Sequence, residues 1–182
     1  MAPGDPILLI LDLDETLIYA TEEPLRRDPD FVIGPYAVYR RPYLAEFLTC
    51  CSACFRLAVW STATEEFVQP VVERIMPPGV EPAFAWGRSR CVRRYDHDRF
   101  EEYHVKDLKK VKRLGNRLER VLIADDTPRK VHRHYGNAVY VPRFFGDPED
   151  EVLPRLARFL ISLRDVPNVR CLEKRGWAGG AR

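Results

Sequence analysis

Two acidic side chains follow an apolar segment near the start of the chain. Residues 7–11 are apolar and β-like, and Asp12 and Asp14 come directly after them. Alternate side chains of a strand point to the same side, so these two acids face one phosphate-sized space if the chain also turns there. Like charges held that close repel, and a buried pair therefore needs a cation or a shared proton. A solvated strand end is the alternative explanation of such a pair.

Two later apolar segments end in residues that suit the same chemistry. One leads into Ser61 and Thr62, and the other leads into Asp125 and Asp126. Lys106 stands between these two segments, just before a helix-like stretch. Ligands and catalytic groups of open α/β sheets lie at the carboxyl ends of the strands. The order of these residues therefore predicts one site built from three strand ends.

The segments that position these residues alternate between strand and helix patterns. Apolar runs of strand length are separated by stretches with helix start and stop signals. This order predicts an α/β, Rossmann-like fold with a central, mostly parallel sheet flanked by helices. The expected strands are residues 7–11, 56–60, 83–86, 121–124 and 138–141, and the expected helices are residues 43–53, 64–75, 109–118, a segment after Pro128, and 149–163.

Two β-like excursions interrupt this alternation. Residues 31–33 and 36–39 flank Gly34-Pro35, which predicts a hairpin or flap after the first strand. Residues 99–105 predict a smaller β insertion before Lys106. Both excursions lie next to the expected site in the chain.

Length and composition are typical of one globular domain. The chain has 182 residues, of which 46% are apolar and 31% charged, and its net charge is +2. No apolar run approaches a membrane span, and residues 7–11 are too short for a signal peptide and lack its basic lead-in. We expect a domain at residues 1–165, a tail at residues 166–182 that is loose at its end, a cytoplasmic location and no membrane contact.

Taken in order, the motifs resemble the haloacid dehalogenase superfamily and, within it, the FCP/SCP-like phosphatases, also called the NLI-interacting-factor family. The resemblance rests on Asp-Leu-Asp-Glu-Thr-Leu from Asp12, Val-Lys-Asp-Leu around Lys106 and Asp-Asp-Thr-Pro from Asp125. It covers residues 7–163. The first motif recurs throughout the superfamily, whereas its combination with the other two indicates this family.

The spacing of the motifs leaves no room for a cap domain, which larger members of the superfamily insert between them. Each interval here holds about fifty residues or fewer, and the flap, helices and strands use most of them. Without a cap, water must be excluded by the substrate itself. We therefore expect an open site that admits a phosphate displayed on a large molecule.

The resemblance implies a magnesium-dependent phosphatase that works through an aspartyl-phosphate. Asp12 is then the nucleophile, and Asp14 protonates the leaving oxygen and later deprotonates the attacking water. Mg²⁺ would be held by Asp12, the main-chain carbonyl of Asp14, and Asp126. Lys106 would pair with the phosphoryl group and neutralise its charge.

Three further roles follow from the same resemblance. Ser61 would donate a hydrogen bond to a phosphoryl oxygen, with Thr62 as a near competitor for that place. Thr16 would brace the loop, and Asp125 would hold Lys106 or the metal. The last two residues suit a structural role equally well.

The substrate is the least determined property at this point. The leading hypothesis is phosphoserine or phosphothreonine in protein. An alternative is a phosphatase of nucleic-acid ends or small phosphate esters, suggested by arginines in residues 88–99, with Arg93 and Arg94 as candidate substrate contacts; a solvated face of mixed charge explains these arginines equally well. A third hypothesis, a non-catalytic protein-binding domain, leaves the full set of catalytic acids unexplained. The oligomeric state is open.

Overall fold

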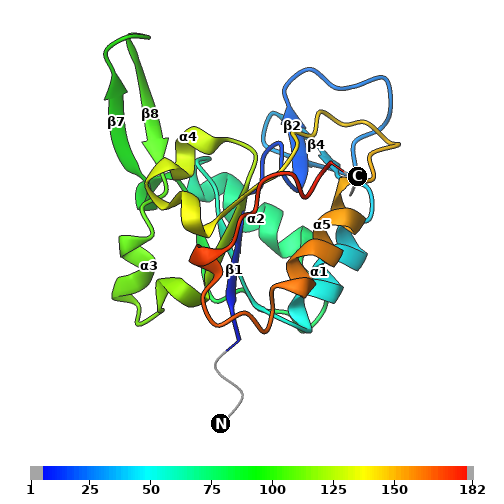
Figure 1. Ribbon diagram of the computed structural model, residues 1–182. Helices are drawn as coiled ribbons and strands as arrows, with labels where there is room; N and C mark the ends of the chain where they lie inside the picture. Colours follow the sequence, from blue (N-terminus) through cyan, green and yellow to red (C-terminus); the bar gives the residue numbers. More distant parts are fainter. Residues whose placement is uncertain (1–5, 180–182) are drawn as a thin grey trace.

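A five-stranded parallel sheet forms the centre of the computed structural model, which describes residues 6–179 (Figure 1). All four residues of the middle strand are buried. Parallel strands covered on both faces read as continuous apolar runs, which explains the composition of residues 7–11. The strands are β1 (Leu8–Leu11), β5 (Arg56–Trp60), β6 (Ala85–Trp86), β9 (Val121–Asp125) and β10 (Ala138–Tyr140), in the order β10-β9-β1-β5-β6.

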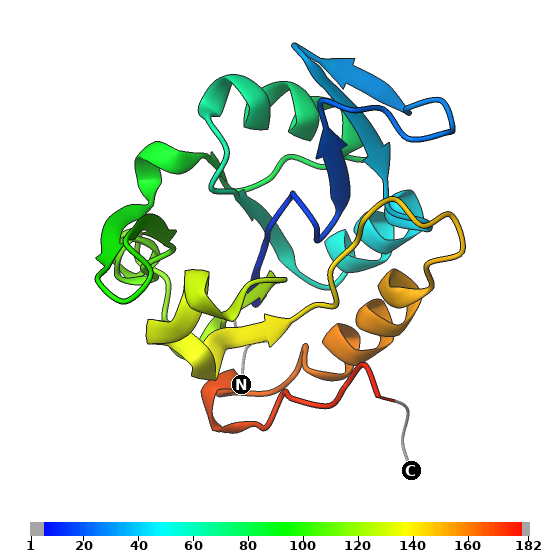
Figure 2. The ribbon, with the colours of Figure 1, turned by 90° about the horizontal axis from the view of Figure 1, so that it is seen from above.

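Helices cover both faces of this sheet (Figure 2). Leu9 and Leu11 belong to a core shared with the helices of one face, and Leu8 and Ile10 to a core shared with those of the other. The alternation follows from the two-residue period of a strand. The predicted α/β fold is confirmed. The first face carries α1 (Leu44–Ser52), α2 (Glu65–Ile75) and α5 (Val152–Ser162), and the second carries α3 (Lys109–Arg113) and α4 (Pro128–Val131).

The flap after the first strand is a three-stranded antiparallel sheet. It consists of β2 (Ile18–Thr21), β4 (Tyr36–Arg40) and β3 (Phe31–Ile33), in that spatial order. The predicted hairpin is thus present, with β2 as an additional strand. Tyr39 is fully buried, and its hydroxyl accepts a hydrogen bond from Leu25 N at 2.8 Å. This contact attaches the loop between β2 and β3 to the flap.

A second excursion projects from the body of the molecule as a hairpin (Figure 1). Its strands are β7 (Val92–Asp96) and β8 (Glu101–Val105), and they pair only with each other. The predicted insertion at residues 99–105 is therefore one arm of this hairpin. A short 3-10 helix, η1 (Arg88–Arg90), connects β6 to it.

Two predicted helices are shorter in the structure. Gly115 adopts a φ of 88°, and the Asn116 side chain donates to the Val111 carbonyl at 3.2 Å, so α3 ends early. The segment after Pro128 changes after α4 into the 3-10 helix η3 (His132–Asn137), with non-helical backbone at His134. Hydrophobic periodicity does not reveal such changes, because they depend on local backbone conformation and on side-chain hydrogen bonds to the backbone.

The last described residues pack onto the domain. Two more 3-10 helices are present, η2 (Leu118–Arg120) and η4 (Val169–Cys171), and Val169 is fully buried in the larger core. Trp177 stacks on Phe159 and donates to the Tyr140 carbonyl at 2.9 Å. The predicted division at residue 165 stays a prediction, and the end of the tail, residues 180–182, lies outside the described residues. None of the helices within residues 6–179 reaches the length and apolar character that a membrane span requires.

Candidate active site

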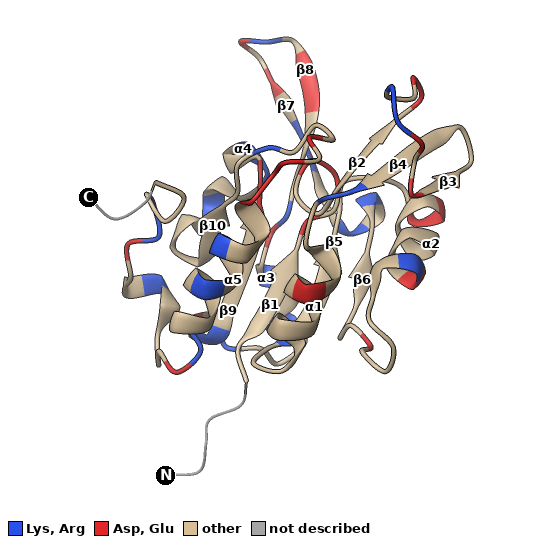
Figure 3. Cartoon of the chain, turned by 90° about the vertical axis from the view of Figure 1, so that its right-hand side faces the viewer, with Lys and Arg blue, Asp and Glu red and all other residues tan. Residues whose placement is uncertain are grey.

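The carboxyl ends of three neighbouring strands supply the polar residues of one site. Asp12 follows β1, Ser61 follows β5, and Asp125 is the last residue of β9. Parallel register places Leu11 beside both Val59 and Ala124, so the three polar residues come out at the same edge. Figure 3 shows acidic and basic segments meeting above this edge.

A tight turn after β1 brings Asp14 to the same side as Asp12. The Leu13 carbonyl accepts hydrogen bonds from Leu17 N at 2.8 Å and Ile18 N at 3.1 Å. These bonds close a turn in which the chain changes direction directly after β1. Glu15 has a positive φ of 60° within this turn. The predicted condition for the two acids to share one space is therefore met.

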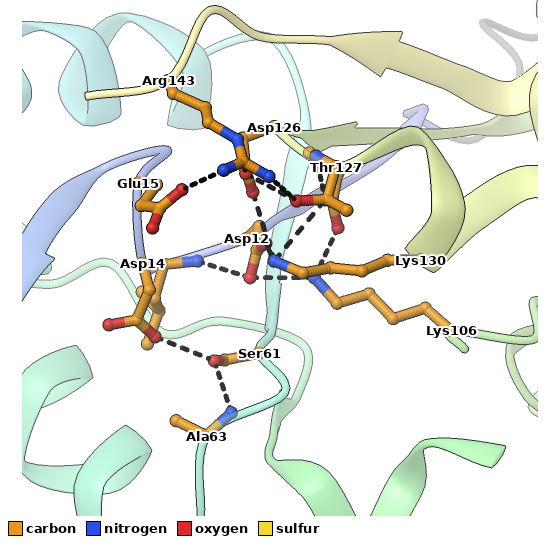
Figure 4. Close-up of polar contacts among 12 residues, drawn as sticks. Asp12, Asp14, Glu15, Ser61, Ala63, Lys106, Asp126, Thr127, Lys130 and Arg143 are labelled. Carbon is orange, nitrogen blue, oxygen red and sulfur yellow. Dashed lines mark hydrogen bonds and ion pairs between the residues drawn. The ribbon is translucent and has the colours of Figure 1, made fainter. Parts of the chain in front are cut away.

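The Asp12 carboxylate lies between two lysines (Figure 4). Its Oδ1 is 2.8 Å from Lys106 Nζ and accepts a hydrogen bond from Leu13 N, and its Oδ2 is 2.8 Å from Lys130 Nζ. Burial would raise the pKa of Asp12, but the two ammonium groups outweigh it and hold that pKa well below its usual range. Asp12 is thus a carboxylate anion at neutral pH.

Lys106 connects Asp12 to a second buried acid. Its Nζ lies 2.6 Å from Asp125 Oδ2, and both side chains are fully buried. The other oxygen of Asp125 accepts a hydrogen bond from Thr127 N at 2.9 Å. The structure therefore brings Asp125 to Lys106, one of its two predicted contacts.

Three carboxylates form a cluster suited to a metal ion. Oxygens of Asp12, Asp125 and Asp126 all lie within 4.8 Å of one another, and all three residues are buried. Mg²⁺ prefers oxygen ligands of this kind, so the donor set fits the implied metal. We call these three residues the carboxylate triad. It contains the predicted ligands Asp12 and Asp126 and also Asp125, which was expected to hold Lys106 or the metal; the third predicted ligand, the Asp14 carbonyl, stays a prediction.

Lys130, which the sequence prediction missed, lies against this triad. Its Nζ is 2.8 Å from Asp12 Oδ2, 3.2 Å from Asp126 Oδ1 and 3.9 Å from Asp125 Oδ1. Burial by itself would lower the pKa of Lys130, but the charges of the three carboxylates outweigh it, and the net pKa is raised. The available signal was its place four residues after Asp126 in a segment begun by Pro128, because residues four apart on a helix are neighbours.

Asp14 and Ser61 face each other on the other side of the site. Ser61 Oγ donates to Asp14 Oδ2 at 3.3 Å and accepts from Ala63 N at 2.9 Å. Burial and the charge of Asp12 raise the pKa of Asp14 to about 6. Thr62 lines the open pocket instead, so the choice between the two hydroxyls as phosphate ligand stays open.

An open pocket of about 430 Å³ leads to these groups. One wall is apolar and comes from the flap and α2, through Ala20, Tyr36 and Phe67. The rest is polar and carries charges of both signs. The polar lining includes Asp14, Glu15, Thr62, Thr64, Arg88, Asp126, Thr127, Lys130 and Arg143.

Arg88 and Arg143 are two further cations at the site; Arg88 is one of the arginines of residues 88–99 that suggested an anionic substrate, whereas Arg143 was not predicted. Arg143 Nε lies 3.2 Å from Asp126 Oδ2, and its Nη1 lies 3.3 Å from Glu15 Oε2. Arg88 Nε donates to the Thr62 carbonyl at 2.8 Å. Both are on connecting segments, where periodicity gives no information about position.

The predicted substrate contacts Arg93 and Arg94 lie elsewhere. Both are exposed on β7, outside the residues that line the pocket. Arg93 Nη1 lies 3.4 Å from Glu102 Oε1, and the two side chains are 72% and 53% exposed. This placement agrees with the alternative explanation of these arginines, in which they belong to a solvated face of mixed charge.

Thr16 lies within the turn after β1, where its N–H donates to the Leu13 carbonyl at 3.1 Å. The residue is fully buried, and its carbonyl accepts a hydrogen bond from Arg41 Nη1 at 2.9 Å. Arg41 in turn binds both carboxylate oxygens of Asp150 at 2.8 Å. The Thr16 hydroxyl has no hydrogen-bond partner among the described residues. The contact that ties the loop to Arg41 is thus made by the Thr16 backbone.

Known proteins resemble the chain in both sequence and fold. The family model described as "NLI interacting factor-like phosphatase" matches residues 7–170. The human "Carboxy-terminal domain RNA polymerase II polypeptide A small phosphatase 1" is 30% identical over 173 residues, which cover 91% of this chain and 62% of that protein. The Caenorhabditis elegans "CTD small phosphatase-like protein 1" is 32% identical over 160 residues, covering 81% of this chain and 30% of that protein.

A solved structure shares the fold. "The Structure of Fcp1, an essential RNA polymerase II CTD phosphatase" superposes with a TM-score of 0.65 at 17% identity, over 88% of this chain and 62% of that one. At this identity the likeness concerns the fold alone. The chain spans less than two thirds of these relatives, so their activities as whole proteins are not assigned to it by the match.

The expected cytoplasmic location is wrong, as the names of two other relatives indicate. "Nuclear envelope morphology protein 1" of Schizosaccharomyces pombe is 29% identical over 90% of this chain and 34% of that protein. "CTD nuclear envelope phosphatase 1 homolog" of Caenorhabditis elegans is 29% identical over 92% of this chain and 71% of that protein. The expectation rested on missing sequence signals, which do not determine where a protein resides.

Proposed function

Because the chain belongs to the NLI interacting factor-like phosphatase family, we propose that it hydrolyses phosphate monoesters of serine or threonine in proteins. The observation that carries this proposal is the Asp12 carboxylate, buried and anionic between two ammonium groups beside an open pocket. An anionic nucleophile approaches an anionic phosphate only where cations neutralise the repulsion. A protein-binding scaffold has no need of that arrangement.

The first chemical step transfers the phosphoryl group to Asp12. A carboxylate oxygen of Asp12 forms a bond to phosphorus while the bond from phosphorus to the serine or threonine oxygen breaks. Asp14, whose pKa is raised to about 6, gives its proton to the leaving oxygen. The products are the free hydroxyl side chain and an aspartyl-phosphate.

The second step returns Asp12 to its starting state. Asp14, now a carboxylate, takes a proton from a water molecule whose oxygen attacks phosphorus. The bond between Asp12 and phosphorus breaks, and inorganic phosphate leaves. Asp14 is again protonated, so the cycle balances.

Positive charge around the phosphate comes from several sources. Lys106 holds Asp12 in place, and Arg88 and Arg143 stand at the pocket wall. Mg²⁺, when bound by Asp12, the Asp14 carbonyl and Asp126, with Asp125 close by, would supply further positive charge to the phosphoryl oxygens.

The open pocket and the relatives' names support a protein substrate. Residues 6–179 include no separate cap, and the open pocket of about 430 Å³ suits a phosphorylated side chain that remains attached to a peptide. The apolar wall of Tyr36 and Phe67 suits contacts with residues beside the phosphorylated one. The human relative's name describes a phosphatase of a polymerase polypeptide, which is protein.

A substrate panel tests this function. Purified protein with Mg²⁺ is assayed on phosphoserine and phosphothreonine peptides, on 5′-phosphorylated oligonucleotides and on an aryl phosphate, with Asp12→Asn as the blank. We expect the highest kcat/KM on phosphopeptides. Faster turnover of oligonucleotides would contradict the substrate class, and no turnover of any substrate would contradict the enzyme.

A further inference from the structure

The ammonium of Lys130 contacts the same carboxylate oxygens that would hold a metal ion. It lies 2.8 Å from Asp12 Oδ2 and 3.2 Å from Asp126 Oδ1 (Figure 4). Mg²⁺ binds oxygen ligands at about 2.0–2.1 Å and demands near-octahedral geometry around itself. The Lys130 ammonium thus lies among the three carboxylates that would hold the ion, so a bound Mg²⁺ would meet a second cation at the same place and be repelled by it.

Charge explains why Lys130 lies there. The triad holds three carboxylates, and Lys106 is fully buried between Asp12 and Asp125. When all three acids are ionised, one ammonium leaves two uncompensated negative charges in a buried site, which is unfavourable, and burial with the charge of Asp12 accordingly raises the pKa of Asp125 to about 7. Lys130 compensates a further one, with Arg143 against the outer oxygen of Asp126.

The side chain of Lys130 has access to the open pocket, whereas that of Lys106 is enclosed by protein. Lys130 is 19% exposed and lines the open pocket, but Lys106 is completely buried. The backbone of Lys130 is fixed, because its N–H donates to the Thr127 carbonyl and its carbonyl accepts from Lys106 N at 2.8 Å. Only the flexible four-carbon stem has to move for the ammonium to leave the triad.

We propose that Lys130 is a tethered competitor of the metal ion. Its ammonium occupies the carboxylate triad in the metal-free protein and moves into the pocket when a divalent cation binds. This contact stabilises the metal-free protein, and it lowers the affinity of the protein for the metal. This inference rests on the proposed metal-dependent function of the same site.

Metal binding by variants measures the competition directly. Isothermal titration with Mg²⁺ compares wild type, Lys130→Met and Lys130→Gln, and Lys112→Met serves as the control because Lys112 is an exposed lysine of α3. Since displacing Lys130 breaks charge-assisted hydrogen bonds, both Lys130 variants should bind Mg²⁺ with a Kd lower by about tenfold or more. The Lys112 variant should match wild type.

Thermal unfolding supplies a second readout that does not depend on activity. Without metal, Lys130→Met should have a lower Tm than wild type, because the triad loses a cation. With saturating Mg²⁺ the difference should shrink or change sign. A merely structural lysine would lower Tm equally with and without the metal.

The outcomes separate this inference from the proposed function. A tighter Kd in both Lys130 variants, with the Tm difference removed by Mg²⁺, supports the competition. An unchanged Kd overturns it and leaves the metal-dependent phosphatase intact. If no variant binds Mg²⁺, both the competition and the metal dependence are overturned, and the substrate panel then decides the phosphatase on its own.

Discussion

Lys106 Nζ lies 2.6 Å from Asp125 Oδ2, and neither side chain is exposed to solvent. Breaking such a buried pair leaves an uncompensated charge in the interior. Lys106→Met removes the cation shared by Asp12 and Asp125 and should lower the free energy of unfolding by about 3–5 kcal/mol. Urea denaturation measures this loss.

The exposed pair of Arg93 and Glu102 is the matched control for that measurement. Arg93→Ala should change the free energy of unfolding by less than about 1 kcal/mol, since exposed ion pairs contribute little. Equal effects of the two substitutions would contradict the stabilising role of Lys106.

Asp12→Asn should abolish turnover and leave the fold intact. The amide is isosteric with the carboxylate but a poor nucleophile, so we expect kcat to fall by roughly a thousandfold or more. Circular dichroism checks the fold. A beryllium fluoride adduct, which mimics an aspartyl-phosphate, should attach to Asp12 in the wild type and be absent from the variant. Normal turnover with metal present would disprove the assignment.

Asp126→Ala and Asp14→Asn should differ in their response to metal. Loss of the Asp126 carboxylate removes a proposed ligand, so half-maximal activity should need roughly 10–100 times more Mg²⁺, and excess Mg²⁺ should restore it. Asp14→Asn should slow both half-reactions at every Mg²⁺ concentration, because its proton transfer is lost. Rescue of Asp14→Asn alone would reverse the two roles.

Arg88→Ala should raise the KM of a phosphopeptide several-fold and weaken its dependence on salt. Arg88 lines the pocket, where its charge acts on the substrate, and added salt screens such attraction. Arg94→Ala, on the exposed hairpin, is the control and should leave KM unchanged. Steady-state kinetics at low and high ionic strength distinguish the two. A larger effect of Arg94 would restore the predicted role of the hairpin arginines.

The pair of Asp107 and His134 predicts a pH-dependent part of stability. Asp107 Oδ1 lies 2.9 Å from His134 Nε2. Burial raises the pKa of Asp107, but the hydrogen bonds from His134 and from Lys109 N outweigh it, and the net pKa is lowered. A carboxyl whose folded pKa is lowered stabilises the fold above its unfolded pKa, and this contribution is lost as pH falls through the folded value.

Asp107→Asn should therefore cost about 1–2 kcal/mol of stability near neutral pH, and the difference from wild type should shrink below about pH 4. Urea denaturation across pH 3–7 measures it. A difference of the same size at both ends would show that the Asp107 charge does not contribute.

Local patterns in the sequence were enough to predict the central sheet and the acidic residues at its strand ends. The central strand, predicted at residues 7–11, is β1 at Leu8–Leu11, because a strand buried on both faces must be apolar throughout. Asp12, Ser61 and Asp125 lie at neighbouring strand ends because parallel strands bring their carboxyl ends to one edge. Helix lengths were less predictable, since Gly115 ends α3 within an otherwise helical pattern.

Contacts between distant segments could be found only in the tertiary structure. Lys130 and Asp12 are 118 residues apart, and their ion pair exists because β9 lies beside β1 and α4 begins shortly after β9 ends. The same dependence on chain packing places Arg143 on Asp126 and Arg93 beside Glu102, outside the residues that line the pocket. The sequence by itself determined the fold class and the chemical kind of the site, because both follow from local periodicity and from residue type. Which cations reach the triad was decided by the tertiary structure, since charge acts through space and is independent of separation along the chain.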